Sequence, residues 1–173
     1  MKKIIFVIIF IFIFLISGNI GEAKVIIPDE AIRLRVIPNS DSEYDQQIKT
    51  KVKNKLQSDV LTLLKDTSDI KTARKIIDDN LLTIDQKINK LLENENYELG
   101  YDINYGYNYF PKKVYKGVTY EEGYYESLVI TLGQGKGSNW WCVLFPPLCL
   151  MEAEENEDIE YASFVEEIIN KYK

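Results

Sequence analysis

The hydrophobic period of the chain changes at Tyr97, and this change constrains the fold more than any other feature of the sequence. Between residues 41 and 95, apolar side chains recur at intervals of three and four, as in amphipathic helices. After Tyr97 they recur at every second position, as in strands with one buried face. This order predicts one α+β domain whose helices pack on one face of a mostly antiparallel sheet.

Two helices are expected in the first half of the chain. Ser40 and Glu43 form a capping box before a stripe of apolar residues, so the first helix should run from about Asp41 to Leu64. The second should start near Ser68 and Asp69. Its segment 78–82 is a poor helix interior, so the pattern allows either one bent helix or two short ones.

The segment 31–37 predicts a half-buried strand, because aliphatic residues alternate with Arg33 and Arg35. The two arginines share one face, which we interpret as solvent-facing or paired with carboxylates of a neighbouring helix. A fork for an acidic partner segment is the functional alternative.

Further strands are expected after Tyr97, with a bulge or turn at Gly106. Nine tyrosines lie between residues 97 and 125 and should line the semi-exposed faces of the sheet. A glycan-binding platform is the functional alternative for these rings.

Both ends of the chain differ in character from the expected domain, residues 24–150. Residues 1–23 combine Lys2 and Lys3 with thirteen apolar residues and a small-residue cleavage signal at Gly21 and Ala23. We expect an export signal, with an uncleaved anchor as the alternative, since a membrane span needs about 20 residues. Residues 151–173 should form an acidic tail that can include a short helix.

The chain contains no histidine and carries a net charge of −6. Without histidine it has no Ser-His-Asp triad, Cys-His dyad or His-ligated zinc site, so we expect neither an enzyme nor a cofactor. The negative charge argues against nucleic acid or anionic lipid as a broad-surface partner.

Two polar motifs resemble ligand-binding loops. Alternating Asn39, Asp41, Glu43 and Asp45 resemble the start of a calcium loop, but a helix cap explains them and the turn glycine is missing. The three glycines of segment 133–137 follow a strand, yet they match neither nucleotide-binding loop, so we expect a turn with close backbone approach.

The segment "GQGKGSNWWCVLFPPLC", residues 133–149, is the most unusual part of the chain. In an extended strand Trp140 and Trp141 point to opposite faces, so one can enter the core while the other stays available for contact. Cys142 and Cys149 are read as a disulfide in an exported protein, with two buried reduced thiols as the alternative. We predict a protein-binding surface made of Trp140, Trp141, Leu144 and Phe145, with Arg33 and Arg35 as secondary members.

Two segments, "IPDEAIRLRVIPNSDSEYDQQIK" and "YESLVITLGQGKGSNWWCVLFPPLC", resemble stage II sporulation protein R of endospore-forming bacteria. The likeness covers roughly residues 1–150 and includes the signal segment. It implies secretion from the forespore into the intermembrane space of the sporulation septum. There such a protein activates a membrane-embedded aspartic protease, which processes the precursor of sigma-E.

The resemblance implies a protein partner, no small-molecule substrate and membrane contact only through the signal segment or the partner. It supplies no residue-level binding site. The competing interpretation is an exported cell-wall glycan-binding module or wall hydrolase.

Overall fold

The structure is a computed structural model that describes residues 30–115, 118–149, 165 and 167–172 of the 173-residue chain. The expected signal segment 1–23, both domain boundaries and most of the acidic tail lie outside the described residues. Among those described, no helix is long and apolar enough to cross a membrane.

Four strands form the main sheet, in the spatial order β2 (Tyr101–Phe110), β5 (Gly123–Leu132), β1 (Ile32–Ile37) and β6 (Trp140–Phe145). β1 runs parallel to β5, whereas the β2–β5 and β1–β6 pairs are antiparallel. The sheet is therefore mixed but mostly antiparallel. The α+β prediction is confirmed.

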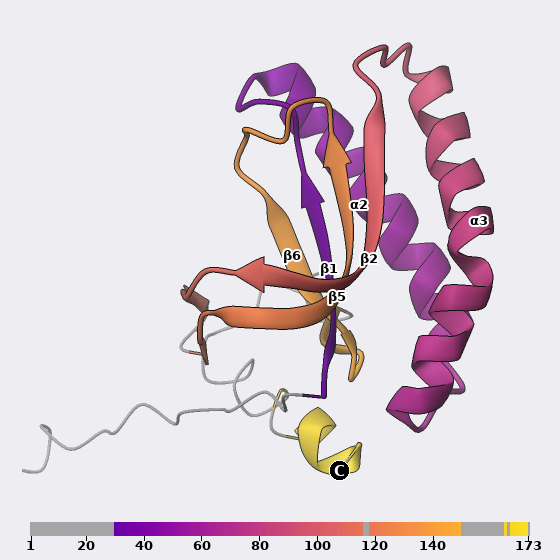
Figure 1. Ribbon diagram of the computed structural model, residues 1–173, viewed down its shortest axis with the longest axis vertical. Helices are drawn as coiled ribbons and strands as arrows, with labels where there is room; N and C mark the ends of the chain where they lie inside the picture. The colour runs from indigo at the N-terminus through magenta and orange to yellow at the C-terminus, as the bar shows by residue number, and fades with distance from the viewer. Residues whose placement is uncertain (1–29, 116–117, 150–164, 166, 173) are drawn as a thin grey trace, which may run out of the picture.

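Two antiparallel helices, α2 (Glu43–Leu64) and α3 (Ile70–Asn94), lie on one face of this sheet (Figure 1). The aliphatic residues of β1 are buried against them, as the alternation in segment 31–37 predicts. Further buried side chains of this core come from α2, α3 and β5: Ile48, Val52, Leu56, Val60, Ile77, Ile84, Ile88, Leu128, Ile130 and Leu132.

The helix starts are set by polar side chains, one of them different from the prediction. Ser42 caps the start of α2, because its hydroxyl accepts a hydrogen bond from the Asp45 amide, so Ser40 is not the cap. Ser40 instead donates its hydroxyl hydrogen bond to the Asp45 carboxylate, which reaches back over the first turn. Asp69 caps α3 by accepting from the Thr72 amide, as predicted.

α3 is one continuous helix through segment 78–82, where the sequence left two alternatives open. The Asn80 amide donates to the Ile76 carbonyl at 2.8 Å, and Lys75 pairs with Asp79 at 2.7 Å. Ile77 and Ile84 are buried on either side of this segment. Packing and these local contacts offset the low helix propensity of the Asp-Asp-Asn run.

The β2–β5 hairpin is long enough to reach across the other face of the sheet. Its outer half, with the small β3 (Lys113–Tyr115) and β4 (Val118–Tyr120) hairpin, turns and crosses β1 and β6 (Figure 1). We call this part, residues 107–115 and 118–126, the arm. The β2–β5 register continues without a shift through Gly106, so the bulge predicted there is absent.

A second, smaller core lies on the face opposite the two long helices. Residues 165 and 167–171 are helical, which agrees with the short helix expected near the C-terminus. Val165 and Ile169 pack there with Val143 of β6 and Tyr120 of the arm. Both faces of β6 are therefore covered.

Candidate partner-binding surface

Trp140 and Trp141 lie on opposite faces of β6, as their adjacency in a strand predicts. Trp140 packs on the main core, and the ammonium of Lys53 lies 4.9 Å from its ring centroid. Trp141 packs edge-on against Phe110 and Tyr120 of the arm, at 5.6 Å and 4.8 Å between centroids. Both indoles are half-buried, so neither stands free in solvent.

Leu144 and Phe145 do not reach the surface, which corrects the expectation of an exposed apolar loop. Their exposed fractions are 0% and 4%. The physical reason is that helices cover one face of β6, while the arm and the C-terminal helical residues cover the other. Alternate side chains of such a strand are buried on both faces.

Cys142 and Cys149 are joined as a disulfide with 5.4 Å between their Cα atoms. Both are buried, and the side-chain amide of Gln57 on α2 donates to the Cys149 carbonyl. The bridge therefore fixes the chain after β6 inside the domain.

Arg33 is 1% exposed and lies in a cage of aromatic rings. Its guanidinium carbon is 3.3 Å from the ring centroid of Tyr125, and Phe110 and Trp141 lie about 5 Å away. Burial lowers the pKa of Arg33, but the side chain stays protonated at physiological pH. Within the described part of the chain, its Nε and Nη1 have no hydrogen-bond partner.

Arg35 also faces the arm. Its Nη1 donates to the Tyr109 carbonyl at 3.1 Å, and its Nε and Nη2 donate to the side-chain oxygen of Asn139 at 3.2 and 2.9 Å. Arg33 is thus buried and Arg35 half-buried beneath the arm, and within the described ranges neither arginine pairs with a helix carboxylate. They hold the arm to the sheet, and Arg33 is inaccessible to an acidic partner in this arrangement.

The acidic residues before α2 connect two loops. Asp41 accepts from the Ser138 amide at 2.6 Å, and this bond is the main cause of its lowered pKa. The hydrogen bond from Ser40 is likewise the main cause of the lowered pKa of Asp45. Capping and loop contacts account for these carboxylates.

The glycine segment packs against residues 38–41. The Gly137 amide donates to the Pro38 carbonyl at 3.1 Å, and a Cβ at Gly137 would lie 2.2 Å from the Ser40 carbonyl oxygen. Gly133 and Gly135 have positive φ angles. This is the close backbone approach that the sequence predicts. It explains why glycine occupies these positions, and no bound phosphate is needed to explain it.

Three of the four exposed aromatic side chains of the described residues lie on the arm, in the tyrosine-rich segment that the sequence assigns to the sheet surface or to a glycan-binding platform; the fourth, Tyr44, lies on α2. Tyr107, Tyr109 and Tyr124 are 71%, 48% and 72% exposed, and we call these three the tyrosine face. Tyr109 and Tyr124 are direct cross-strand partners with ring centroids 5.6 Å apart. The Tyr109 hydroxyl donates to Glu122 at 3.0 Å, which raises its pKa.

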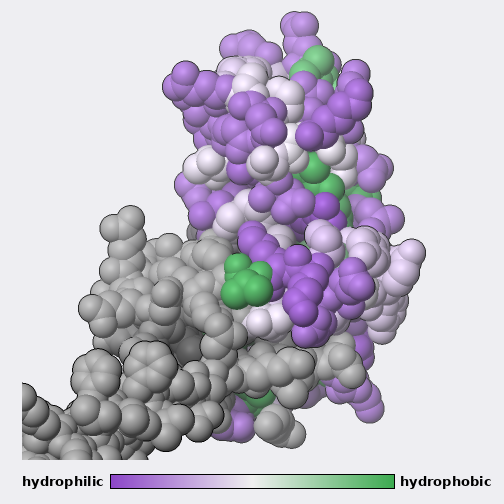
Figure 2. All heavy atoms as spheres, turned by 90° about the vertical axis from the view of Figure 1, so that its left-hand side faces the viewer, coloured by the Kyte–Doolittle hydropathy of each residue, from purple (hydrophilic) through white to green (hydrophobic). Residues whose placement is uncertain are grey.

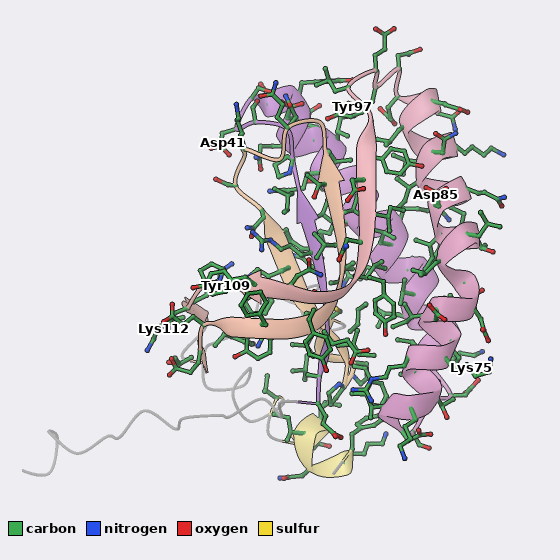
Figure 3. All side chains as sticks on the ribbon, in the orientation of Figure 1. Asp41, Lys75, Asp85, Tyr97, Tyr109 and Lys112 are labelled. Carbon is green, nitrogen blue, oxygen red and sulfur yellow. A yellow bond between two sulfur atoms is a disulfide. The ribbon has the colours of Figure 1, made fainter. Side chains whose placement is uncertain are left out.

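The surface near the arm has little aliphatic character. Figure 2 shows described residues that are mostly hydrophilic, with small and separate hydrophobic spots. Tyr109 projects from the arm in Figure 3. A contact here would therefore use amphipathic tyrosine rings, which combine a large apolar area with a hydroxyl group. The tyrosines at every second position of residues 105–109 were the available sequence signal.

Comparison with known proteins gives one family. A family model described as stage II sporulation protein R matches residues 28–155. The stage II sporulation protein R of Bacillus subtilis (strain 168) is 37% identical over 171 residues, covering 92% of this chain and 76% of that protein. No solved structure matches the chain.

Proposed function

Because the chain belongs to the stage II sporulation protein R family, we propose that it is an exported sporulation signalling protein. It is secreted from the forespore into the intermembrane space of the septum. There it activates a membrane-embedded aspartic protease, and that protease processes the precursor of sigma-E. The chain itself performs no catalysis.

The family match over residues 28–155 carries this proposal, because it spans nearly all of the described domain. The charged and apolar segments of residues 1–23 support export. The absence of histidine and the structural use of the buried carboxylates support a binding role. Glu126, for example, is occupied by Arg74 at 2.8 Å and by the Tyr105 hydroxyl at 2.8 Å.

We assign the contact with the protease to the tyrosine face. Three exposed rings lie on an arm that Arg33 and Arg35 fasten to the sheet, so their positions are largely fixed before binding. Tyrosine loses little conformational entropy on binding and is frequent among residues that dominate binding energy. The half-buried Trp141 supports the arm from beneath.

A complementation experiment in a sporulating strain that lacks its own copy tests the proposal. The wild-type chain should restore cleavage of the sigma-E precursor, followed by immunoblot. A variant with Tyr107→Ser, Tyr109→Ser and Tyr124→Ser should accumulate normally but lose cleavage. Tyr44→Ser is the matched control, because Tyr44 is 49% exposed but lies on α2.

The two parts of the proposal fail differently in this experiment. If the wild-type chain does not restore cleavage, the signalling function is wrong. If the triple variant restores cleavage as well as the control does, the function stands and the contact surface lies elsewhere.

A cell-wall glycan-binding module or wall hydrolase is the second candidate, since exposed tyrosine pairs also stack on sugars. Retention of the purified chain on isolated peptidoglycan, or release of muropeptides from it, without restored cleavage in the strain, would favour this candidate.

A further inference from the structure

β2 is an edge strand of the described sheet, and the outer side of its first half faces no other described strand. Among the described residues it pairs only with β5. The Gly133 amide donates to the Gly100 carbonyl, and in an antiparallel ladder hydrogen-bonded pairs alternate with non-bonded pairs. The N–H and C=O groups of Tyr101, Ile103 and Tyr105 therefore point away from β5, toward the open edge.

An open groove of about 670 Å³ follows this edge, between β2 and α3. Its lining residues come from these two elements: Leu81, Leu82, Asp85, Tyr101, Asp102, Ile103 and Tyr105. Leu82 is 68% exposed although it is a large aliphatic residue. In Figure 1, α3 lies beside the β2 edge of the sheet, so an additional strand there would cover the α3 wall of the groove.

The groove has a rigid frame. Tyr101 donates its hydroxyl hydrogen bond to the Asp85 carboxylate at 2.8 Å, which joins β2 to the side of α3 that faces it (Figure 3). Arg74 of α3 binds Glu126 of β5 with two hydrogen bonds, and Tyr105 of β2 donates to the same carboxylate. These contacts fix the spacing between the helix and the strand, so the groove exists before any ligand arrives.

The negative charge of the groove favours a positively charged occupant. Asp85 and Asp102 line it, and none of the described lining residues is Lys or Arg. Burial, the hydrogen bond to Asp85 and nearby carboxylate charge together raise the pKa of Tyr101 to about 12. Arg74, whose charge acts on Tyr105 of the groove, is already paired with Glu126. A second copy of this chain, with net charge −6, would bring like charge to the same edge.

We propose that this groove binds an extended, basic segment of another protein, which adds to the sheet as a strand beside β2. Apolar side chains at alternate positions of the segment contact Leu81, Leu82 and Ile103. Lys or Arg side chains at the intervening positions lie on the opposite face, next to Asp102. Backbone hydrogen bonds to β2 supply affinity, and the alternating pockets supply selectivity. The inference stands independently of the proposed function.

The probe is a blocked heptapeptide in which lysine and valine alternate, added to the full-length chain in a mild detergent. At a peptide concentration about ten times Kd, amide exchange at Ile103 and Tyr105 should slow about tenfold, because only the unbound fraction exchanges. The Asn104 amide, which already bonds to β5, should change little. A peptide with glutamate in place of lysine is the matched negative control.

Two variants of exposed groove residues test the location. Leu82→Ser and Asp102→Lys should each weaken binding of the lysine peptide about fivefold, through loss of apolar contact or reversal of a cross-strand charge pair. Leu99→Ser is the control, because Leu99 is 57% exposed but does not line the groove. Circular dichroism checks that all three variants fold.

Equal binding of the two peptides, unchanged affinity in both groove variants, or no protection at Ile103 and Tyr105 would each overturn the proposal. So would protection of these amides without peptide that rises with protein concentration, together with a dimer in sedimentation velocity. That result would assign the edge to a second copy of this chain.

Discussion

Two substitutions of Arg33 distinguish how much the volume of this side chain and how much its charge contribute to the stability of the domain. Arg33→Ala removes a fully buried large side chain from between β1 and the arm, and such truncations cost about 2–5 kcal/mol of unfolding free energy. Arg33→Met keeps most of the volume but removes the cation. Lost contact with the Tyr125 ring should cost about 2 kcal/mol, because the pair is desolvated.

In the methionine variant, removal of buried donors that lack a hydrogen bond offsets the loss of the contact with the Tyr125 ring. The Nε and Nη1 groups of Arg33 have no hydrogen-bond partner in the described part of the chain, and each such buried donor costs about 1–3 kcal/mol. Arg33→Met should therefore be within about 1 kcal/mol of the wild type, or more stable than it. Shape would then hold the arm in place, with little net contribution from the charge.

Urea unfolding followed by tryptophan fluorescence measures both variants, since Trp141 lies in the same cage. The expected order of stability is methionine variant equal to or above wild type, with the alanine variant clearly below. If methionine is as destabilising as alanine, the cation–π contacts outweigh the unsatisfied donors and the reasoning is wrong. If alanine is neutral, Arg33 is not buried as described.

Three further predictions concern the parts that hold the domain together. Cys142 and Cys149 are separated by 7 positions, so replacing both with alanine should lower the free energy of unfolding by at most about 2.5 kcal/mol in urea titrations. An unaltered midpoint would mean that the disulfide does not constrain the unfolded chain. Asp45 has a lowered pKa in the folded state, chiefly through Ser40, so its stabilisation exists above the ordinary aspartate pKa and is lost as pH falls below it. Asp45→Asn should therefore lower stability at pH 7 and reduce the loss of stability as pH falls below the ordinary aspartate pKa, and an unchanged pH dependence on the acid side would contradict this. Gly137→Ala should destabilise by about 1–3 kcal/mol or more, because its Cβ would meet the Ser40 carbonyl. Gly106→Ala should stabilise by about 0.5 kcal/mol, because its Cβ would make only an ordinary contact, 3.9 Å from the Asn104 side chain, in a regular strand. Equal melting temperatures for these two variants would refute the contrast.

The sequence predicts well those elements that depend on local periodicity. The strand in segment 31–37, both helices and the strands after Tyr97 all have a regular apolar spacing, and all are present. The helix cap was misplaced by two residues because Ser40 and Ser42 are equivalent in a short motif. Contacts with a distant loop, such as that of Asp41 with Ser138, 97 residues away, fix the arrangement of this segment in space.

The position of the arm could not be predicted, because it depends on contacts between distant residues. The cage around Arg33 brings together β1, β2, β5 and β6, and an alternating pattern does not say which element covers the polar face of β1. For the same reason Leu144 and Phe145 looked like an exposed patch. A strand covered on both faces has the same composition as an apolar contact loop.

The tyrosines of β2 include both half-buried and exposed side chains. Tyr101 and Tyr105 are half-buried against α3, while Tyr107 and Tyr109 are exposed beyond Gly106. Their sequence pattern is continuous, so the difference comes from the turn of the hairpin away from the helices (Figure 1). The candidate contact surface therefore required the structure, although every residue in it belongs to the tyrosine-rich segment recognised in the sequence.

Reconstitution tests the central claim of protease activation most directly. The full-length chain is added to liposomes that contain the membrane-embedded aspartic protease and the sigma-E precursor, and precursor cleavage is measured over time. The account predicts cleavage that rises with the amount of chain added and falls with the triple tyrosine variant. Cleavage at the same rate with and without the chain would contradict it.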